Sequence, residues 1–338
     1  MSHPKISVIV PILNGGPFIR DCLSFLKAQT YRDFEIIAVI DTRSTDNSLE
    51  LMQEGLKEFP ASQILLQDKG YRQGGNRNIG LAVAQGDYLW FCDVDDAPVP
   101  TFLESMNIVL DLTDADFACC NFTNVGPNGL IKKKKEQTQI RILNQEQAIE
   151  FCNLGKMPIA PWGKMFKTGF LKENHIEFED IGAEDVLFTY VCLKACSKVS
   201  VYDKELYAYR QTPNSVCRAT IKPDLRGQEE IASYGRVDEI FPDNRDVLIH
   251  SAIMKMRSSM HMTYRSAIAY AKSDVNRYNY DHYLKGYFEA GWNRRLPRLY
   301  FIAVRSYIKL VYKRNGSRGV NMRTDLGYLI PYPQNQTR

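Results

Sequence analysis

The chain has 338 residues, enough for one large domain or two modest ones, and its apolar and charged fractions of 44% and 24% are typical of a globular protein. A formal net charge of +4 is too small to indicate nucleic-acid binding by itself. The first residues lack the form of a signal peptide and no apolar run is long enough to span a bilayer, while eight cysteines without CxxC pairs favour reduced, buried thiols over a disulfide framework.

Strand and helix signals alternate over the first hundred residues. Four short apolar runs read as strands: "KISVIVP", "FEIIAVI", "SQILLQ" and "DYLWFC". Helical patterns separate them, beginning with "PFIRDCLSFLKAQ", where Pro17 can open the helix, and ending with "GGNRNIGLAVAQ". This order predicts a Rossmann-like α/β fold, with a mostly parallel sheet and helices on both of its faces.

Polar groups or glycines follow all four predicted strands. The segments are "PILNGG", "DTRSTDNS", "QDKGYRQGGNRN" and "DVDD". In a parallel sheet these segments lie at one edge, outside the carboxyl ends of the strands, where ligands bind. The mixed charge there suits a ligand with phosphates, a metal and a hydroxylated ring better than an apolar ligand.

The pattern changes after Asp96. The runs "ADFACCNFTNV" and "QTQIRIL" flank the turn signal "GPNG", which predicts a hairpin carrying the solvated lysines 132–135. Helices are expected at "NQEQAIEFCNLG" and at "EDIGAEDVLFTYVCLKAC", and "KVSVYDKELYAYR" reads as strand pairs. From about Ile221 the signals are helical. We therefore expect a domain over residues 1–220, made of halves 1–98 and 99–220, and a helical region over 221–338.

The last helical stretch is strongly basic. No acid lies between Glu289 and Asp325, and the residues that share one face at helical spacing are Arg298, Arg305, Lys309 and Lys313. This pattern fits an interfacial helix on an anionic membrane. It fits equally a helix packed on the protein with a solvated basic face.

Two acidic clusters could carry chemistry. Asp93, Asp95 and Asp96 stand within four positions at a strand end, where carboxylates suit Mg²⁺ or Mn²⁺ shared with a diphosphate, although a solvated loop would also explain them. Glu184 and Asp185 could supply a general base or merely complement a helix dipole.

The motifs together resemble a known family. "SVIVPILNGG", "VIDTRSTDNS" and "GGNRNIGLAVAQGDYLWFCDVDD", in this order, are similar to the nucleotide-binding half of glycosyltransferase family 2, which has the GT-A fold. "PWGKMFKTGFLKENHIEF", "GAEDVLF" and "LYAYRQTPNSV" are similar to the acceptor half of its surface-polysaccharide members. The resemblance covers about residues 5–217.

The resemblance implies roles for matching residues. For the donor nucleotide these are the first-loop residues Pro11, Leu13 and Asn14 around the nucleoside, Asp41 at the base, Arg77 near the base or diphosphate, Asp93 at the ribose, and Arg210 on the diphosphate. Asp95 would bind the metal, with Asp93 and Asp96 as further candidates, and Asp185 of the Glu184–Asp185 pair would be the base. Trp162 and Lys164 are the candidates for the acceptor side, with an alternative structural role for Trp162. The chain departs from the family at Leu13, at Gly15–Gly16 and at Thr42–Arg43.

The implied function is that of a metal-dependent inverting glycosyltransferase. It would move a sugar from a nucleotide-sugar, with UDP as the expected nucleotide, to a saccharide or a lipid-linked saccharide in cell-surface polysaccharide synthesis. The expected location is the cytoplasm or the inner face of the cell membrane. The alternatives are a sugar-nucleotide pyrophosphorylase, for which "PILNGG" lacks the expected arginine, and a non-catalytic saccharide-binding protein.

Overall fold

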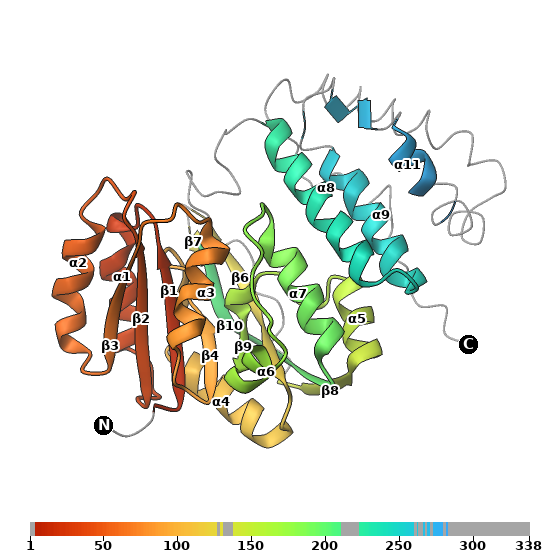
Figure 1. Ribbon diagram of the computed structural model, residues 1–338. Helices are drawn as coiled ribbons and strands as arrows, with labels where there is room; N and C mark the ends of the chain where they lie inside the picture. Colours follow the sequence, from red (N-terminus) through yellow and green to blue (C-terminus); the bar gives the residue numbers. More distant parts are fainter. Residues whose placement is uncertain are drawn as a thin grey trace. The chain divides into compact units, whose positions relative to one another are not determined.

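The computed structural model describes residues 4–126, 129–130, 138–210, 223–259, 262, 266–267, 269–270, 273–279 and 282 (Figure 1). The chain divides into two compact units, Met1–Ala219 and Thr220–Arg338. This division falls one residue before the predicted end of the first domain. That the two units are separate domains stays a prediction.

One mixed sheet organises the first unit. Its order within the described residues is β3 (Ser62–Gln67), β2 (Phe34–Asp41), β1 (Ile6–Ile12), β4 (Tyr88–Phe91), β9 (Lys164–Lys167), β6 (Phe117–Gly126), β10 (Lys198–Arg210) and β5 (Ala97–Pro98). Strand β1 pairs in parallel with β2 and β4, and β2 pairs in parallel with β3. The carboxyl ends of the four predicted strands therefore share one edge of the sheet.

Helices cover both faces of this sheet, as predicted. Alternate residues of β1, such as Ile6 and Val8, join a buried cluster with Ile19 of α1 (Gly16–Lys27) and Met106 of α4 (Phe102–Thr113). On the other face α3 (Gln73–Val83) lies so close that a Cβ on Gly80 would come within 2.5 Å of the Ile9 side chain. Only glycine permits this approach without a shift of the neighbouring side chain.

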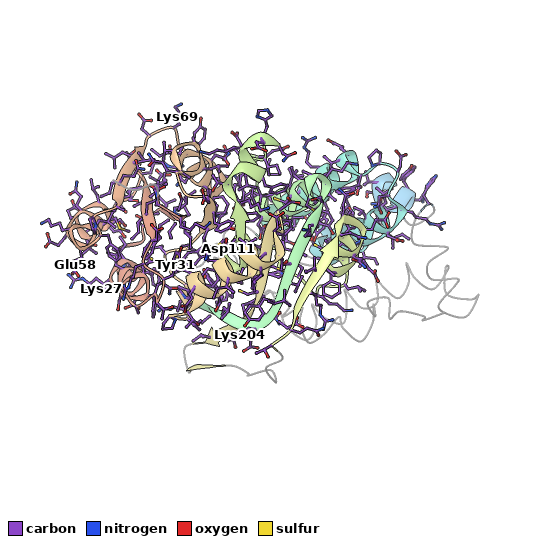
Figure 2. The ribbon with its side chains drawn as sticks, turned by 90° about the horizontal axis from the view of Figure 1, so that it is seen from below. Lys27, Tyr31, Glu58, Lys69, Asp111 and Lys204 are labelled. Carbon is purple, nitrogen blue, oxygen red and sulfur yellow. The ribbon has the colours of Figure 1, made fainter. Side chains whose placement is uncertain are left out.

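Short connections complete the nucleotide half. Helix α2 (Ser48–Gly55) continues into the 3₁₀ turn η1 (Leu56–Glu58). An ion pair between Lys27 and Glu58 joins α1 to η1 at the surface (Figure 2). The seven cysteines among the described residues are all free and buried, in agreement with the expectation of reduced thiols.

The hairpin predicted after Asp96 is wrong in its second strand. Strand β6 pairs with the short β7 (Gly129–Leu130), but "QTQIRIL" forms β8 (Ile140–Asn144), which pairs antiparallel with β10. Strand β10 is one long strand with register shifts between Tyr202 and Tyr207, where strand pairs were expected. Hydrophobic alternation identifies a strand but does not name the neighbour that completes its hydrogen bonds.

The second half of the first unit adds short helices around the sheet. They are α5 (Gln145–Asn153), the 3₁₀ turn η2 (Pro161–Gly163), α6 (Thr168–Glu173) and α7 (Glu184–Ala195). Helix α5 begins with a capping box, in which Asn144 Oδ1 accepts from the Gln147 backbone at 2.9 Å.

The second unit is helical where it is described, as predicted. Helices α8 (Pro223–Ile240) and α9 (Arg245–Ser259) pack together, joined by the Lys255–Asp238 ion pair, and α11 (Asp274–Asn279) follows. Over the described part of the chain, none of the helices combines the length and the apolar character needed to cross a membrane. The basic residues 294–318 and the lysines 132–135 lie outside the described residues.

Candidate functional site

The loops after β1 and β2 hold each other in place. Asn14 adopts a left-handed conformation with φ of 51°, which asparagine tolerates better than most residues. Its backbone N–H donates to Ser44 Oγ at 3.1 Å and its Oδ1 accepts from the Thr45 N–H at 2.8 Å. Pro11 is buried within β1, whereas Leu13 is 50% exposed at the edge of the sheet. The predicted first-loop residues thus lie at the carboxyl edge, with Leu13 available to a ligand.

Asp41, at the end of β2, is fully buried and heavily bonded. Arg43 donates to it from the backbone and from Nε, both at 2.9 Å to Oδ1, and from Nη2 at 2.5 Å to Oδ2. Gln67, the last residue of β3, donates from Nε2 to Asp41 Oδ2 at 3.1 Å and to Asn76 Oδ1 at 2.9 Å. Hydrogen bonding from Arg43 keeps the pKa of Asp41 below its ordinary value.

Arg77 joins two acidic clusters that are far apart in the sequence. Its side chain is 3% exposed, with Nη2 donating to Asp93 Oδ1 at 2.8 Å and Nη1 donating to Glu184 Oε1 at 2.9 Å. The guanidinium also lies 5.2 Å from the centre of the Phe178 ring. Because its charge is enclosed between two carboxylates, Arg77 faces them rather than an incoming diphosphate.

The close contact between α3 and α7 depends on a glycine. A Cβ on Gly74 would lie 2.8 Å from Phe178 Cβ and 3.0 Å from Glu184 Cγ. Gln73, one residue earlier, donates to Asp93 Oδ1 at 3.0 Å. The Gly-Gly pair in "QGGNRN" signalled this close approach, but nothing in the sequence singled out Gln73.

Asp185, the residue after Glu184, has a raised pKa. Burial, together with the neighbouring charge of Glu184, raises the pKa of Asp185 to about 6, although Arg77 and Lys164 oppose the shift. A carboxyl group with a pKa near 6 is ionised at neutral pH and is a better proton acceptor than an ordinary aspartate. This is the property that a general base needs.

Backbone strain immediately precedes the two acids. Ala183 has φ of 53°, a left-handed conformation that costs an L residue with a Cβ about 1–2 kcal/mol. It forms the N-cap of α7, so it sets the direction from which Glu184 and Asp185 enter the helix. Strain of this kind is found at functional sites, where surrounding contacts hold it.

Asp96 differs from its neighbours in the triple-aspartate tip. It is 1% exposed, with Oδ2 accepting from the Tyr207 hydroxyl at 3.0 Å and Oδ1 accepting from the Arg210 backbone at 2.9 Å. Burial, with added repulsion from Asp93 and Asp95, raises the pKa of Asp96 well above its ordinary value. A carboxyl that is 1% exposed and whose two oxygens already accept hydrogen bonds offers little to a cation, so the geometry argues against Asp96 as a metal ligand.

Asp95 and Asp93 are better placed for a metal. Asp95 is partly exposed at the tip, and Asp93 keeps 16% of its side chain exposed. Among the described residues no group of three or more His, Cys, Asp or Glu side chains is arranged to hold a metal ion. Two carboxylates nevertheless fit Mg²⁺ or Mn²⁺, because such ions are usually bound by one or two carboxylates and complete their shell with substrate phosphates and water.

The two predicted acceptor residues are structural. Lys164 is 1% exposed, and its Nζ donates to the carbonyls of Pro158, Ile159 and Ala160 and to the Thr189 hydroxyl. Trp162 is 6% exposed, with its indole stacked on the rings of Tyr207 and Tyr209 at 4.5 and 5.4 Å. Neither side chain offers a surface to an acceptor sugar, so the acceptor prediction for both is corrected; the structural alternative considered for Trp162 fits.

Arg210 lies at the end of β10 and faces α1. Its Nη1 donates to Asp21 Oδ2 at 3.0 Å, and its guanidinium lies 6.0 Å from the centre of the Phe18 ring. While it holds this ion pair, 29% of its side chain stays exposed to solvent. Its role on the diphosphate stays a prediction.

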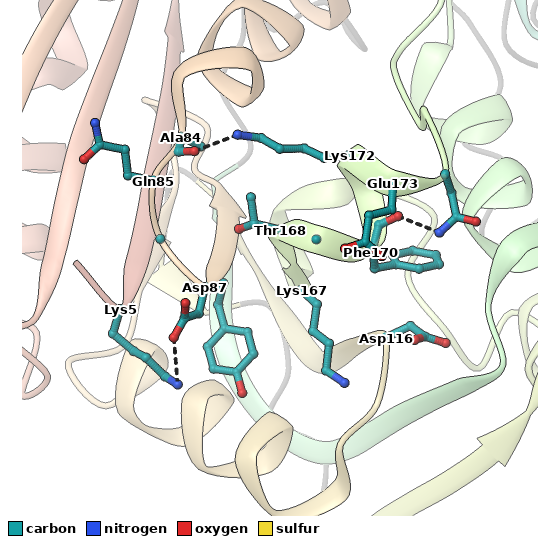
Figure 3. Close-up of a pocket in the computed structure, with 14 residues that line it drawn as sticks. Lys5, Ala84, Gln85, Asp87, Asp116, Lys167, Thr168, Phe170, Lys172 and Glu173 are labelled. Carbon is teal, nitrogen blue, oxygen red and sulfur yellow. Dashed lines mark hydrogen bonds and ion pairs between the residues drawn. The ribbon is translucent and has the colours of Figure 1, made fainter. Parts of the chain in front are cut away.

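A separate pocket of about 780 Å³ opens at the other end of β4 (Figure 3). Its charges balance: Lys5, Lys167 and Lys172 stand against Asp87, Asp116 and Glu173. All three lysines are engaged: Lys5 with Asp87 at 3.2 Å, Lys172 with the Ala84 carbonyl at 2.8 Å, and Lys167 in an ion pair with Asp114. The pocket lies away from the acidic clusters and does not belong to the candidate site.

Comparisons with known proteins point in one direction. The family model described as Glycosyl transferase family 2 matches residues 7–174. An uncharacterized glycosyltransferase, EpsJ, of Bacillus subtilis is 28% identical over 66% of this chain and 65% of its own length. A poly(ribitol-phosphate) beta-glucosyltransferase of Bacillus spizizenii is 26% identical over 85% of this chain and 45% of its own length. Each alignment thus spans less than two thirds of the relative.

The fold is shared with a solved structure. Residues 1–349 of TarS from Staphylococcus aureus, in complex with UDP-GlcNAc, align with a TM-score of 0.61 over 92% of both chains at 19% identity. This likeness concerns the fold, and it agrees with the mixed α/β architecture and the helices described above.

Proposed function

Because this chain belongs to glycosyl transferase family 2, we propose that it moves a sugar from a nucleotide-sugar to a hydroxyl group of a saccharide or related polymer. The proposed donor is UDP-linked, as the sequence resemblance implies, and the proposed pathway is cell-surface polysaccharide synthesis. Two kinds of relative support the proposal: one acts on poly(ribitol-phosphate) and one was crystallised with UDP-GlcNAc. The lipid-linked acceptor and the membrane location remain part of the proposal.

The observation that carries this proposal is the bridge made by Arg77. It ties Asp93, at the tip of β4, to Glu184, in the first turn of α7. The tip would hold the donor and α7 would supply the base. A single buried guanidinium therefore fixes the donor side and the acceptor side of one site relative to each other.

The proposed reaction is a single inverting displacement. The acceptor oxygen attacks the anomeric carbon, the bond from that carbon to the diphosphate oxygen breaks with its electron pair, and the acceptor proton passes to the Asp185 carboxylate. The transition state resembles an oxocarbenium ion, as in glycoside hydrolysis. Glu184 is held by Arg77, so it positions the pair, while Asp185 accepts the proton.

Asp95, with Asp93 beside it, would hold a Mg²⁺ or Mn²⁺ ion. Such an ion, when bound, stabilises the negative charge that grows on the departing diphosphate. Asp93 has Oδ1 fixed by Arg77 and Gln73, which orients the carboxylate. Pre-orientation of this kind lowers the reorganisation needed in the transition state.

The experiment that tests the proposed function is a screen of nucleotide-sugars for released nucleotide, with and without Mn²⁺ and in the presence of candidate polyol-phosphate and saccharide acceptors. We expect release from at least one donor. A pyrophosphorylase would instead form nucleoside triphosphate when pyrophosphate is supplied. A non-catalytic binding protein would bind a nucleotide and release none, and that result would contradict the proposal.

The pKa of Asp185 predicts the pH dependence of transfer. A base must be deprotonated, so kcat should be constant above pH 7 and should fall about tenfold per pH unit below about 6. Because Glu184 and Asp185 interact, this limb reports the pair rather than one residue. A rate profile at saturating donor and metal between pH 5 and 8 measures it. A profile that stays flat down to pH 5 would rule out a base with this pKa.

A further inference from the structure

The carboxylate of Asp41 has no acceptor position left for a ligand. A carboxylate offers about four lone-pair sites. Four donors occupy them: the Arg43 backbone, Arg43 Nε, Arg43 Nη2 and Gln67 Nε2. The side chain is also wholly inaccessible to solvent. A ligand N–H can therefore reach Asp41 only if Arg43 leaves.

Arg43, in contrast, has donors to spare. Half of its side chain is exposed, and Nη2 is used by Asp41 and by the Tyr71 carbonyl at 2.8 Å. Among the residues that the structure describes, no partner engages Nη1. That nitrogen carries two N–H groups and lies beside Gly70 in the loop after β3, where a Cβ would stand at an ordinary contact distance of 3.5 Å.

The neighbouring residues keep this arrangement in place. Gln67 is 2% exposed, and its amide can bond both Asp41 and Asn76 only with its nitrogen turned toward them. Rotating the Gln67 amide by 180° would place its oxygen against Asp41 Oδ2 and Asn76 Oδ1. Strand pairing fixes Gln67 opposite Asp41, so the acid and its donors form one rigid unit.

We propose that Arg43 determines which nucleotide base the donor site accepts, by closing Asp41 to ligand N–H groups and presenting its own N–H groups to a base carbonyl. This inference rests on the proposed function, together with the position of the base at Asp41, at the end of β2, which the family resemblance implies. Uracil and cytosine share the O2 carbonyl but differ at N3, which donates in uracil and accepts in cytosine. Arg43 N–H groups directed at the shared O2 distinguish the two bases weakly, whereas a free Asp41 would accept the N3–H of uracil and favour that base.

The test is the affinity of the full-length protein for UDP and for CDP, measured by calorimetry with Mn²⁺. The wild type should bind the two with similar affinity. Arg43→Ala should shift the ratio toward UDP by about tenfold, because one hydrogen bond to a charged group is gained with uracil. Asp41→Asn in the Arg43→Ala background should cancel that gain. Arg32→Ala, which removes an exposed arginine bonded to the Lys27 carbonyl, should leave the ratio unchanged.

Two results would overturn the inference alone: a wild type that binds UDP at least about tenfold more tightly than CDP, or a folded Arg43→Ala protein with the wild-type ratio. If Arg43→Ala does not fold, Arg43→Lys replaces it, with a smaller shift expected in the same direction because lysine cannot fork across both oxygens. Failure of every nucleoside diphosphate to bind would instead contradict the proposed function itself.

Discussion

Asp185→Asn should lower the rate of sugar transfer by about 10²–10⁴-fold, the usual contribution of general acid–base catalysis. Asparagine keeps the shape of the side chain and the contact with the Val186 N–H, now 2.9 Å from Asp185 Oδ1, but it cannot accept the acceptor proton. Nucleotide affinity should be unchanged, because the donor is held at the β4 tip. Rates of nucleotide release and calorimetric binding measure the two properties separately.

The same variant should be at least as stable as the wild type. The folded-state pKa of Asp185, about 6, lies above the ordinary value of 3.8. Ionising this carboxyl therefore costs folding free energy, which is absent at low pH and fully present above pH 6. Asparagine removes that cost at neutral pH. Asp33→Asn, an exposed carboxylate away from the site, is the matched control and should change neither rate nor stability. A lost affinity for nucleotide in Asp185→Asn would contradict the assignment of Asp185 as the base.

Arg77→Ala should destabilise the first unit by about 3–5 kcal/mol, the usual cost of breaking a buried ion pair by removing one partner. Asp93 and Glu184, 16% and 15% exposed, would be left as neighbouring carboxylates without their shared cation. Thermal unfolding measures the loss. Arg141→Ala is the matched control, because its ion pair with Asp203 is more exposed and should contribute at most about 1 kcal/mol.

Arg77→Lys separates stability from geometry. Lysine keeps the charge but cannot hold two carboxylates in a fixed fork. We expect the Arg77→Lys protein to be more stable than Arg77→Ala but less stable than the wild type, and its rate of sugar transfer to fall strongly. Because Arg77 lowers the pKa of Asp185, any folded variant that weakens this contact should also show its acid limb at higher pH than the wild type. An Arg77→Ala protein as stable as Arg141→Ala would contradict the bridge.

The sequence was informative about the fold because each strand end is a local signal. The runs "KISVIVP", "FEIIAVI", "SQILLQ" and "DYLWFC" all became parallel strands, and their carboxyl ends met at one edge. The partner of β8 was missed because strand pairing depends on residues far along the chain. For the same reason the sequence did not reveal that Asp96 is bonded inside the protein while Asp95 is partly exposed: the hydroxyl that bonds Asp96 belongs to Tyr207, 111 positions away.

Residue type alone suggested an acceptor role for two residues that the structure shows to be buried. A tryptophan and a lysine beside a predicted site suggest sugar stacking and hydrogen bonding, but Trp162 packs on Tyr207 and Tyr209, and Lys164 uses its ammonium group on backbone carbonyls. Arg43 was visible only as a departure from the family pattern. Its contact with Asp41 became apparent when the backbone placed the two side chains side by side.

The proposed function requires the tip of β4 to bind a metal together with the donor diphosphate, and Asp95 is the residue proposed to hold that metal. The measurement is nucleotide release by the wild type and by Asp95→Asn, each with Mn²⁺ and after chelation. We expect chelation to abolish release by the wild type, and Asp95→Asn to stay folded and inactive under both conditions. Full activity of Asp95→Asn, or wild-type release that is indifferent to chelation, would contradict it.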